Sequence, residues 1–318
     1  MSTTDARQRN MQSIEKIDTT DLGGGVMPRD LFDQFYQEVQ ESAELLDLVR
    51  TETLGRQQEA IPKIGVDERQ MEAVGEDETG TFRGANTGAV ELDVVKTAIY
   101  WELTSEAVED TVDNVADILL NKFQQQFAAD VQDLGINGEG AAGTGFEAIN
   151  QGWVHMAQNG DDENSDRLGN DTMPSYDHAG GGVNTALFDE AIQTLEGRYR
   201  DDDFVFLMSK DNVQEYKAFL TDRETGLGDA VLFGDSDLTP FSYPVIGVSN
   251  WDDDETAMFT DPQNLIWALR RDVEIDVIDE SDEVLERDLF ARYALRARHD
   301  YQIEDMQKGV VIENIQTA

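Results

Sequence analysis

The sequence predicts an α+β fold, and three stretches of the chain carry this prediction. In TAIYWELTSEAVEDTV (97–112), apolar residues first alternate, and from Ser105 they recur three and four apart. This is a change from the period of a strand to that of a helix. Extended segments flank a glycine-rich stretch at 56–90, and the tail from Leu289 alternates again. Long strands and one long helix are therefore expected in the same chain.

Composition indicates a globular chain with a sizeable core and excludes several classes. The 318 residues are 39% hydrophobic, and none is cysteine, which excludes disulfides, thiolate zinc sites and cysteine nucleophiles. The longest apolar runs span only a few residues, so we expect no membrane helix. The polar N-terminus has no apolar core typical of a signal peptide.

The charge is strongly acidic, with 67 Asp and Glu against 24 Lys and Arg and a formal net charge of −43. Such a surface repels itself in dilute buffer, whereas in molar salt the Debye length falls to about 3 Å. We interpret the chain as a protein of a molar-salt cytoplasm, because its acids spread along the whole sequence. The alternative is an acidic partner of a basic protein. Sequence-specific DNA binding needs a basic patch and is disfavoured.

The N-terminal third predicts a polar arm, a helix and a hairpin. After 22 polar residues and the breaker GGGVMP (23–28), apolar residues recur at helical spacing from Leu31 to Val49. The stretch 56–90 holds five glycines and few apolar residues between two strand-like flanks, EAIPKI and VELDVVKTAIYWEL. It is long for a loop in a compact domain. We therefore predict a two-stranded hairpin that projects from the body.

A helix over 104–134 is the best-defined element. Its apolar stripe consists of Val108, Val112, Val115, Leu119, Phe123, Phe127, Val131 and Leu134. Thr104 or Ser105 can cap its start and Gly135 can end it. At 1.5 Å per residue it would be roughly 45 Å long.

The remainder predicts a turn, a surface loop and a series of helices and strands. GINGEGAAGTG is a chain-reversing turn, and the polar segment 155–183 is a surface loop. We expect helices in TALFDEAIQTLEGRYR and DNVQEYKAFL. Strands are expected in FVFLMS, LTPFSYPVIGVSN, AMFTD, LIWALR, VEIDVID, the alternating LFARYALRAR and the final GVVIENI.

No motif predicts a catalytic, cofactor or metal site. GEGAAG (138–143) matches G-x-G-x-x-G but follows a helix, whereas a dinucleotide site requires a preceding strand. DDENSD (161–166) fails the calcium-loop template because Arg167 and Met173 replace its glycine and its bidentate acid. Acidic runs at 201–203 and 252–255 are interpreted as solvated turns, with loose cation binding as the alternative.

The histidines match no catalytic or metal motif, whereas several arginines are clustered near the end of the chain. His155, His178 and His299 are far apart, and neither H-E-x-x-H nor G-x-S-x-G occurs. An active site assembled from distant residues remains an alternative. Six arginines fall within twenty-nine residues, and they need carboxylate partners either in the same chain or in a neighbouring subunit. These six are Arg270, Arg271, Arg287, Arg292, Arg296 and Arg298.

The ordered series resembles the major capsid proteins of tailed phages and tailed archaeal viruses, which have the Johnson or HK-ninety-seven-type fold. The matching stretches are GGGVMP, ESAELLDLV, AVGEDETGTF, YWELTSEAVEDT, LGINGEG with GFEAI, FVFLMSKDNVQEYKAFLTDRETG and YPVIGVSN. The resemblance implies five parts. They are an N-terminal arm (1–56), an E-loop (57–96), a peripheral domain (97–149) with a spine helix (104–134), an axial domain (150–268) and C-terminal strands (269–318).

The resemblance implies a non-enzymatic protein that self-assembles as hexamers and pentamers into an icosahedral shell around double-stranded DNA. It also implies that the arm between Arg56 and Val90 buries its apolar residues on another copy of the chain. Portal, scaffolding and decoration proteins are implied partners, without cofactors, membrane contact or sequence-specific DNA contact. Val74 and Gly75 stand where many relatives have a tryptophan and an acid. No long scaffolding region precedes Gly23, and Lys63 has no identifiable cross-linking partner. The alternatives are an encapsulin-type nanocompartment and a halophilic α/β enzyme.

Overall fold

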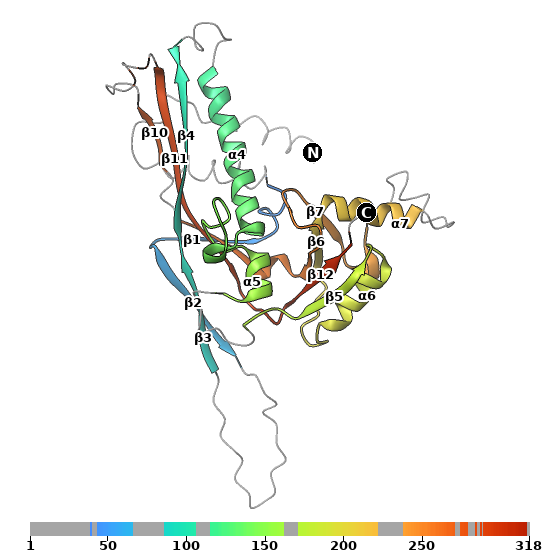
Figure 1. The fold of residues 1–318 in the computed structure, drawn as a ribbon. Helices are drawn as coiled ribbons and strands as arrows, with labels where there is room; N and C mark the ends of the chain where they lie inside the picture. Colours follow the sequence, from blue (N-terminus) through green and yellow to red (C-terminus); the bar gives the residue numbers. More distant parts are fainter. Residues whose placement is uncertain are drawn as a thin grey trace, which may run out of the picture. The chain divides into compact units, whose positions relative to one another are not determined.

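A computed structural model describes residues 39, 43–65, 86–105, 115–161, 171–221, 238–270, 274–278, 284, 287 and 289–316. Contacts divide the chain into two compact units. The described parts of Ala98–Phe127 and Asp272–Ala297 belong to unit 1. Unit 2 comprises the described parts of Ala43–Thr97, Ala128–Arg271 and Arg298–Ala318. Three elements continue from one unit into the other: β4 (Val95–Thr104), α4 (Val115–Asn137) and β11 (Leu289–Ile303) (Figure 1).

Unit 1 is a sheet with the helix α4 against one face. Strand β10 (Glu274–Ile278) pairs antiparallel with β11, and β4 pairs with β11 as well. Trp101 of β4 stacks on Phe123 of α4, with ring centroids 4.3 Å apart, and on Tyr293 of β11 at 5.1 Å. The predicted alternation of β4 is confirmed, because Trp101 and Leu103 are buried while their neighbours in sequence are exposed.

Helix α4 continues to Asn137, so the prediction that it ends at Leu134, before Gly135, is wrong. A Cβ atom at position 135 would lie 2.8 Å from a ring carbon of Tyr301 and 2.9 Å from one of Trp153. The glycine therefore permits close packing inside the helix, and it does not act as a stop signal. Ser105 is helical, and residues 106–114 of the predicted helix lie outside the described part of the chain.

The predicted hairpin is confirmed as β2 (Gln58–Gly65) paired antiparallel with β3 (Asn86–Asp93). The strand predicted over 90–103 is broken at Val94 into β3 and β4. Upstream, Leu45 to Val49 form turns and not the predicted helix, because the Leu45 N–H donates to the side chain of Gln132 at 2.9 Å. Apart from Val39, which is helical, the earlier part of that helix lies outside the described residues.

Two strand groups make up the rest of unit 2. Strand β1 (Arg50–Leu54) runs parallel to β9 (Leu265–Arg270), which pairs with the end of β11. A second sheet has the order β5-β12-β8-β6-β7. Its members are β5 (Ser175–Gly181), β6 (Val205–Ser209), β7 (Val245–Val248), β8 (Ala257–Thr260) and β12 (Gly309–Ile315).

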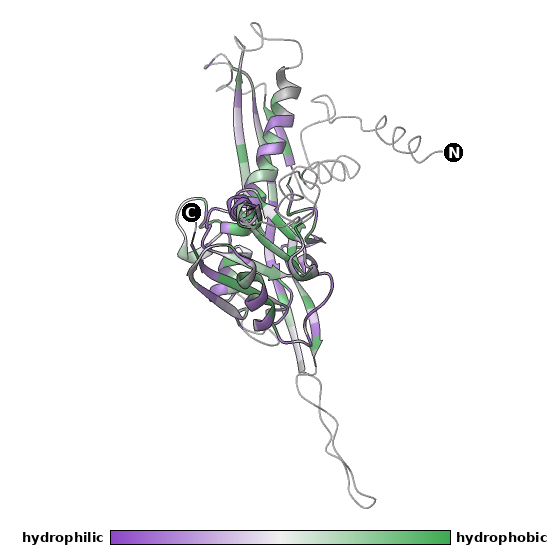
Figure 2. Cartoon of the chain, turned by 90° about the vertical axis from the view of Figure 1, so that its right-hand side faces the viewer, coloured by the Kyte–Doolittle hydropathy of each residue, from purple (hydrophilic) through white to green (hydrophobic). Residues whose placement is uncertain are grey.

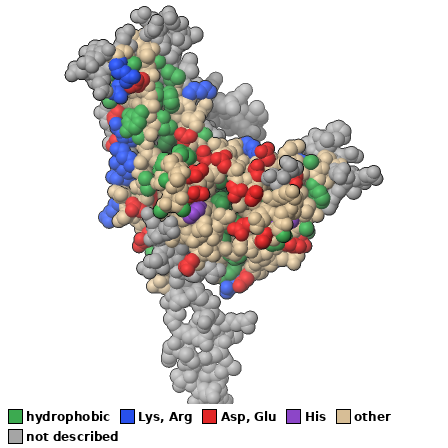
Figure 3. Space-filling model, viewed as in Figure 1, with side chains coloured by type: hydrophobic (Ala, Val, Ile, Leu, Met, Phe, Trp, Pro, Cys, Tyr) green, Lys and Arg blue, Asp and Glu red, His purple; other side chains and the backbone are tan. Residues whose placement is uncertain are grey.

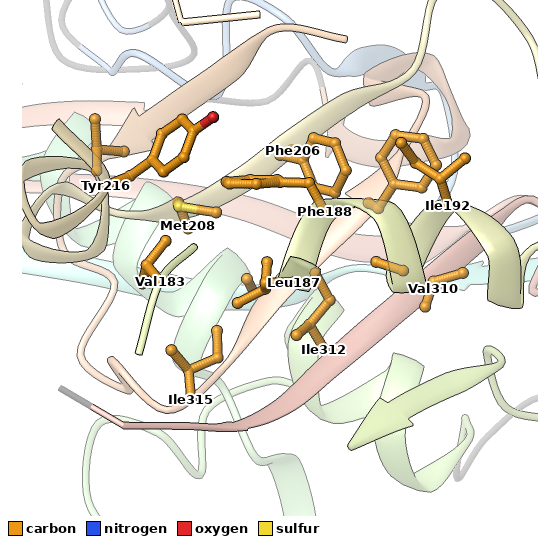
Figure 4. Close-up of a cluster of buried hydrophobic side chains, with 14 of the residues drawn as sticks. Val183, Leu187, Phe188, Ile192, Phe206, Met208, Tyr216, Val310, Ile312 and Ile315 are labelled. Carbon is orange, nitrogen blue, oxygen red and sulfur yellow. The ribbon is translucent and has the colours of Figure 1, made fainter. Parts of the chain in front are cut away.

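Helices α6 (Thr185–Thr194) and α7 (Lys210–Thr221) bury their apolar sides on this second sheet. Phe188 of α6 meets Phe206 of β6 edge-on, with centroids 4.7 Å apart, and contacts Tyr216 of α7 at 4.6 Å. Figure 4 shows these rings between the helices and the strands. Figure 2 shows hydrophilic and hydrophobic residues alternating along the helices, as expected for elements with one buried side.

The surface loop predicted over 155–183 is wrong in two places, where the structure has a helix and a strand. Helix α5 (Trp153–Asn159) is held by the buried Trp153, whose ring N–H donates to the carbonyls of Ile266 and Gln302. Strand β5 is extended because it pairs in parallel with β12. Short 3-10 turns occupy Gly140–Ala142, Pro240–Ser242 and Pro262–Asn264. None of the described helices is long and apolar enough to cross a bilayer.

Candidate functional site

The base of the hairpin is fixed to unit 2 by a buried carboxylate. Asp300 is 4% exposed, and its Oδ2 accepts the backbone N–H of Asp93 at 2.9 Å, at the end of β3. Its Oδ1 accepts the side-chain amide of Asn150 at 3.0 Å and the N–H of Tyr301 at 2.9 Å. A buried carboxyl group that accepts several hydrogen bonds is costly to disturb, because each donor would lose its partner. The exit direction of the hairpin is therefore set at this point.

A second set of contacts holds β2. The Lys63 ammonium donates to the backbone carbonyl of Glu304, and its nitrogen lies 4.0 Å from that residue's carboxylate. Arg50 pairs with the other oxygen of the same carboxylate at 2.9 Å. Lys63 therefore forms these contacts within its own chain. The sequence had identified no cross-linking partner for it.

The apolar residues of the hairpin divide into two groups. We expected the arm between Arg56 and Val90 to bury its apolar residues on another copy. That expectation is wrong for Val90, which is 1% exposed, and for Ile61, which packs against a cluster that includes Leu54 and Leu92. Farther out, Ile64 is 78% exposed. For Ile64 burial on a neighbour stays a prediction, and residues 66–85 lie outside the described residues.

Three of the six clustered arginines pair within the same chain. Arg287 and Arg292 approach Glu102 at 2.8 and 3.2 Å. Arg296 pairs with Asp276 and lies over the ring of Tyr100, and these two partners raise the pKa of the guanidinium. Figure 3 shows Lys and Arg side chains gathered on the side of β10 and β11, beside acidic ones. For these three arginines the carboxylate partners that the sequence required lie in the same chain.

The glycine motif does not form a nucleotide site. GEGAAG follows α4 directly and forms a turn in which the Gly140 N–H donates to the carbonyls of Glu147 and Asn150, both at 3.1 Å. The motif therefore reverses the chain after the helix, as predicted, and lacks the strand that a dinucleotide fold places before it.

The histidines lie on three different elements. His155 is on α5 and His178 on β5, whereas His299 is on β11, where burial lowers its pKa to about 4. Within the described ranges no three His, Asp or Glu residues are placed to hold a metal ion. In the acidic run 252–255, the side chain of Asp253 accepts the Glu255 N–H within a local turn. Of the acidic run 161–166, only Asp161 lies in the described part of the chain. Sequence reasoning missed Asp300, because one acid among 67 gives no signal of burial.

Solved phage capsid structures share this fold over nearly its whole length. The procapsid of satellite phage P4, solved with its size determination protein, has a TM-score of 0.65 at 14% identity, covering 100% of this chain and 99% of that chain. The capsid of a native GTA particle gives 0.66 at 14% identity, with 99% of each chain covered. Mycobacterium phage Cain gives 0.56 at 12% identity, covering 86% and 90%. At these identities the likeness establishes the fold.

The family is established by sequence. The profile of the phage capsid family matches residues 23–311, so the chain belongs to the phage capsid family. No curated protein matched in a separate search. The chain is therefore a structural, non-enzymatic protein of the virion capsid, and the alternative of a halophilic enzyme is set aside.

Proposed function

We propose that this chain is the major capsid protein of a tailed virus from a molar-salt host, assembling as hexamers and pentamers into an icosahedral shell around double-stranded DNA. In this proposal 1–56 form an N-terminal arm, 57–96 an E-loop and 150–268 an axial domain. The peripheral domain consists of 97–149, with its spine helix, and the C-terminal strands 269–318. Portal, scaffolding and decoration proteins would be its partners. The observation that carries the proposal is a hairpin anchored at its base that exposes Ile64.

The mechanism is mechanical. Each hairpin is held on its own chain by Asp300 and Glu304, and its outer part would cover a neighbouring subunit. Burying one isoleucine side chain contributes about 2 kcal/mol, which corresponds to roughly thirtyfold in affinity for each contact. Summed over many subunits, such modest contacts would close a shell without covalent bonds.

A matched pair of substitutions tests this mechanism. Ile64→Glu should abolish or strongly reduce particles in electron micrographs at molar salt, because a carboxylate would be buried at each contact. Ile64→Leu keeps the apolar surface and should assemble normally. Circular dichroism should show the same fold for both variants. If Ile64→Glu assembled as well as Ile64→Leu, the hairpin would not be a contact surface.

The charge gives an independent test of the molar-salt assignment. With a net charge of −43 per chain, repulsion between subunits grows as the Debye length lengthens from about 3 Å at 1 M salt to about 10 Å at 0.1 M. Light scattering should show shells dissociating on dialysis into dilute buffer. Shells that persist unchanged there would contradict the assignment to a high-salt host.

The contents of purified particles decide between a virus and a nanocompartment. A viral shell should contain nuclease-protected double-stranded DNA when isolated from infected cells. Particles that hold protein cargo and no DNA would favour the encapsulin-type alternative.

A further inference from the structure

Among the described strands, the second sheet of unit 2 ends in two edges of unlike charge. In the order β5-β12-β8-β6-β7, the strands β5 and β7 lie at opposite ends. An edge strand presents unpaired backbone groups that another chain can meet. A contact between unlike edges of two copies would be head-to-tail, and head-to-tail contacts form a ring when the rotation between copies closes and an open filament when it does not.

The β7 edge carries a basic groove, which is unusual in so acidic a chain. A hollow of about 500 Å³ lies between α7 and β7, and none of its lining residues is acidic. These residues are Lys210, Val213, Gln214, Lys217, Leu238, Val245 and Gly247. Two of the chain's seven lysines thus face the groove. Acidic Asp211 and Glu215 lie elsewhere on α7, outside the lining.

The two lysines differ in their present contacts. Lys210 pairs with Glu44 at 2.8 Å, whereas Lys217 is exposed and forms no ion pair among the described residues. A backbone hydrogen bond borders the groove, in which the Val245 N–H donates to the Leu238 carbonyl at 2.9 Å. The turn that joins these two residues displays Phe241, which is 53% exposed and held at a φ of 53°. A bulky residue in that left-handed region is strained, so the surrounding turn must hold it in place.

The β5 edge has the opposite character. Neither β5 nor α6, which packs beside it, contains Lys or Arg. Asp177 is fully exposed, and hydrogen bonds from Asn314 and the Ala179 N–H lower its pKa, so it stays charged. Glu190 of α6 is also exposed and accepts the hydroxyl of Tyr176. Figure 3 shows acidic side chains over the region of β5 and α6.

We propose that the β7–α7 groove of one copy receives the acidic β5–α6 edge of a second copy, and that this head-to-tail contact closes the rings of the shell. The inference rests on the proposed function. Its physical basis is that contact between two acidic surfaces is repulsive, whereas none of the residues that line the groove is acidic and the facing edge carries the exposed Asp177 and Glu190. At molar salt only charges in direct contact keep their attraction, so an exposed carboxylate of the second copy that meets Lys217 directly would stabilise the interface.

Site-specific cross-linking tests the geometry, and the cysteine-free chain provides a clean background. In assembled particles of a Gln214→Cys, Gln193→Cys double variant, which keeps Lys217 and Glu190, a bismaleimide linker should join chains into a ladder ending at five or six. Either single variant should remain monomeric on denaturing gels. Dimers from Gln214→Cys alone would mean that α7 meets α7, and no ladder from the double variant would also overturn the proposal.

Charge reversal tests the energetics with a matched control. Lys217→Glu should reduce assembled particles about fivefold or more, since it replaces an attraction by a repulsion at each contact. Adding Glu190→Lys should restore assembly. Lys122→Glu changes the net charge equally at an exposed site on α4 and should assemble normally. If the wild-type chain forms shells but Lys217→Glu assembles equally well, this contact is wrong and the shell function stands. If the wild-type chain forms no particles, the proposed function itself fails.

Discussion

Acidification should destabilise this fold through one buried imidazole. His299 lies on β11 with 2% of its surface exposed, and burial lowers its pKa from 6.5 to about 4. Its Nδ1 lies 3.5 Å from the Thr97 hydroxyl, and its ring contacts that of Tyr301. The folded chain therefore holds this side chain neutral under conditions where an unfolded chain would protonate it.

The sign and size of the effect follow from linkage. Between the folded and unfolded pKa values the unfolded state binds the extra proton, so stability falls as the pH decreases through that window. Each pKa unit corresponds to about 1.4 kcal/mol, so the full loss is about 3 kcal/mol, of which about 2 kcal/mol is lost by pH 5. Below the folded pKa both states are protonated, and His299 contributes no further loss.

Urea unfolding of the unassembled chain at molar salt measures this directly. Between pH 7 and pH 5 the wild-type chain should lose about 2 kcal/mol more than a His299→Gln variant, in which nothing titrates at this position. Equal pH dependence in the wild type and His299→Gln would refute the reasoning, because other groups would then carry the acid sensitivity.

Three further substitutions test the packing. Asp300→Asn should cost about 2 kcal/mol and accelerate amide hydrogen exchange at Asp93, since the charged acceptor of that N–H is lost. Gly135→Ala should lower the thermal midpoint by an amount equivalent to about 1–3 kcal/mol, although alanine favours helices, because its Cβ would lie 2.8 Å from Tyr301. Trp101→Leu should cost about 2–3 kcal/mol in urea unfolding, because it removes two ring stacks.

Two of these predictions have a control variant, and the third has a clear contradicting outcome. Asp201→Asn, at an exposed site, should leave both stability and exchange near the wild-type values. Trp101→Phe retains a ring and should recover part of the loss caused by Trp101→Leu. A Gly135→Ala chain as stable as the wild type would show that the two rings can shift, and that the glycine is not required for packing.

Regular patterns made most elements predictable from the sequence. The alternation at Trp101 and Leu103 is a local period that predicts a strand without tertiary information. The hairpin was likewise predicted from local features, a glycine-rich stretch between two strand-like flanks. The prediction of a helix up to Val49 was wrong for its last residues. The Leu45 N–H donates to the side chain of Gln132, a residue far away in the chain, and this contact cannot be read from local sequence. Strand β5 was missed because its sequence, SYDHAGG, is extended only through its pairing with β12.

The candidate contact surfaces depended more on the fold. The sequence left open whether the clustered arginines pair within the chain, and the structure places Glu102 and Asp276 beside three of them. Lys210 and Lys217 are seven residues apart on one helix, but their groove exists only because β7 packs beside α7. Such a site combines residues that no local pattern connects.

By itself, the sequence determined the acidic surface, the absence of thiol chemistry and the order of strands, hairpin and long helix, because composition and period are local properties. Tertiary structure alone decided that Gly135 lies inside a helix, that Asp300 is buried at the hairpin base, and that a basic and an acidic edge end the same sheet. The physical reason is that burial and charge neighbours are set by which distant segments meet.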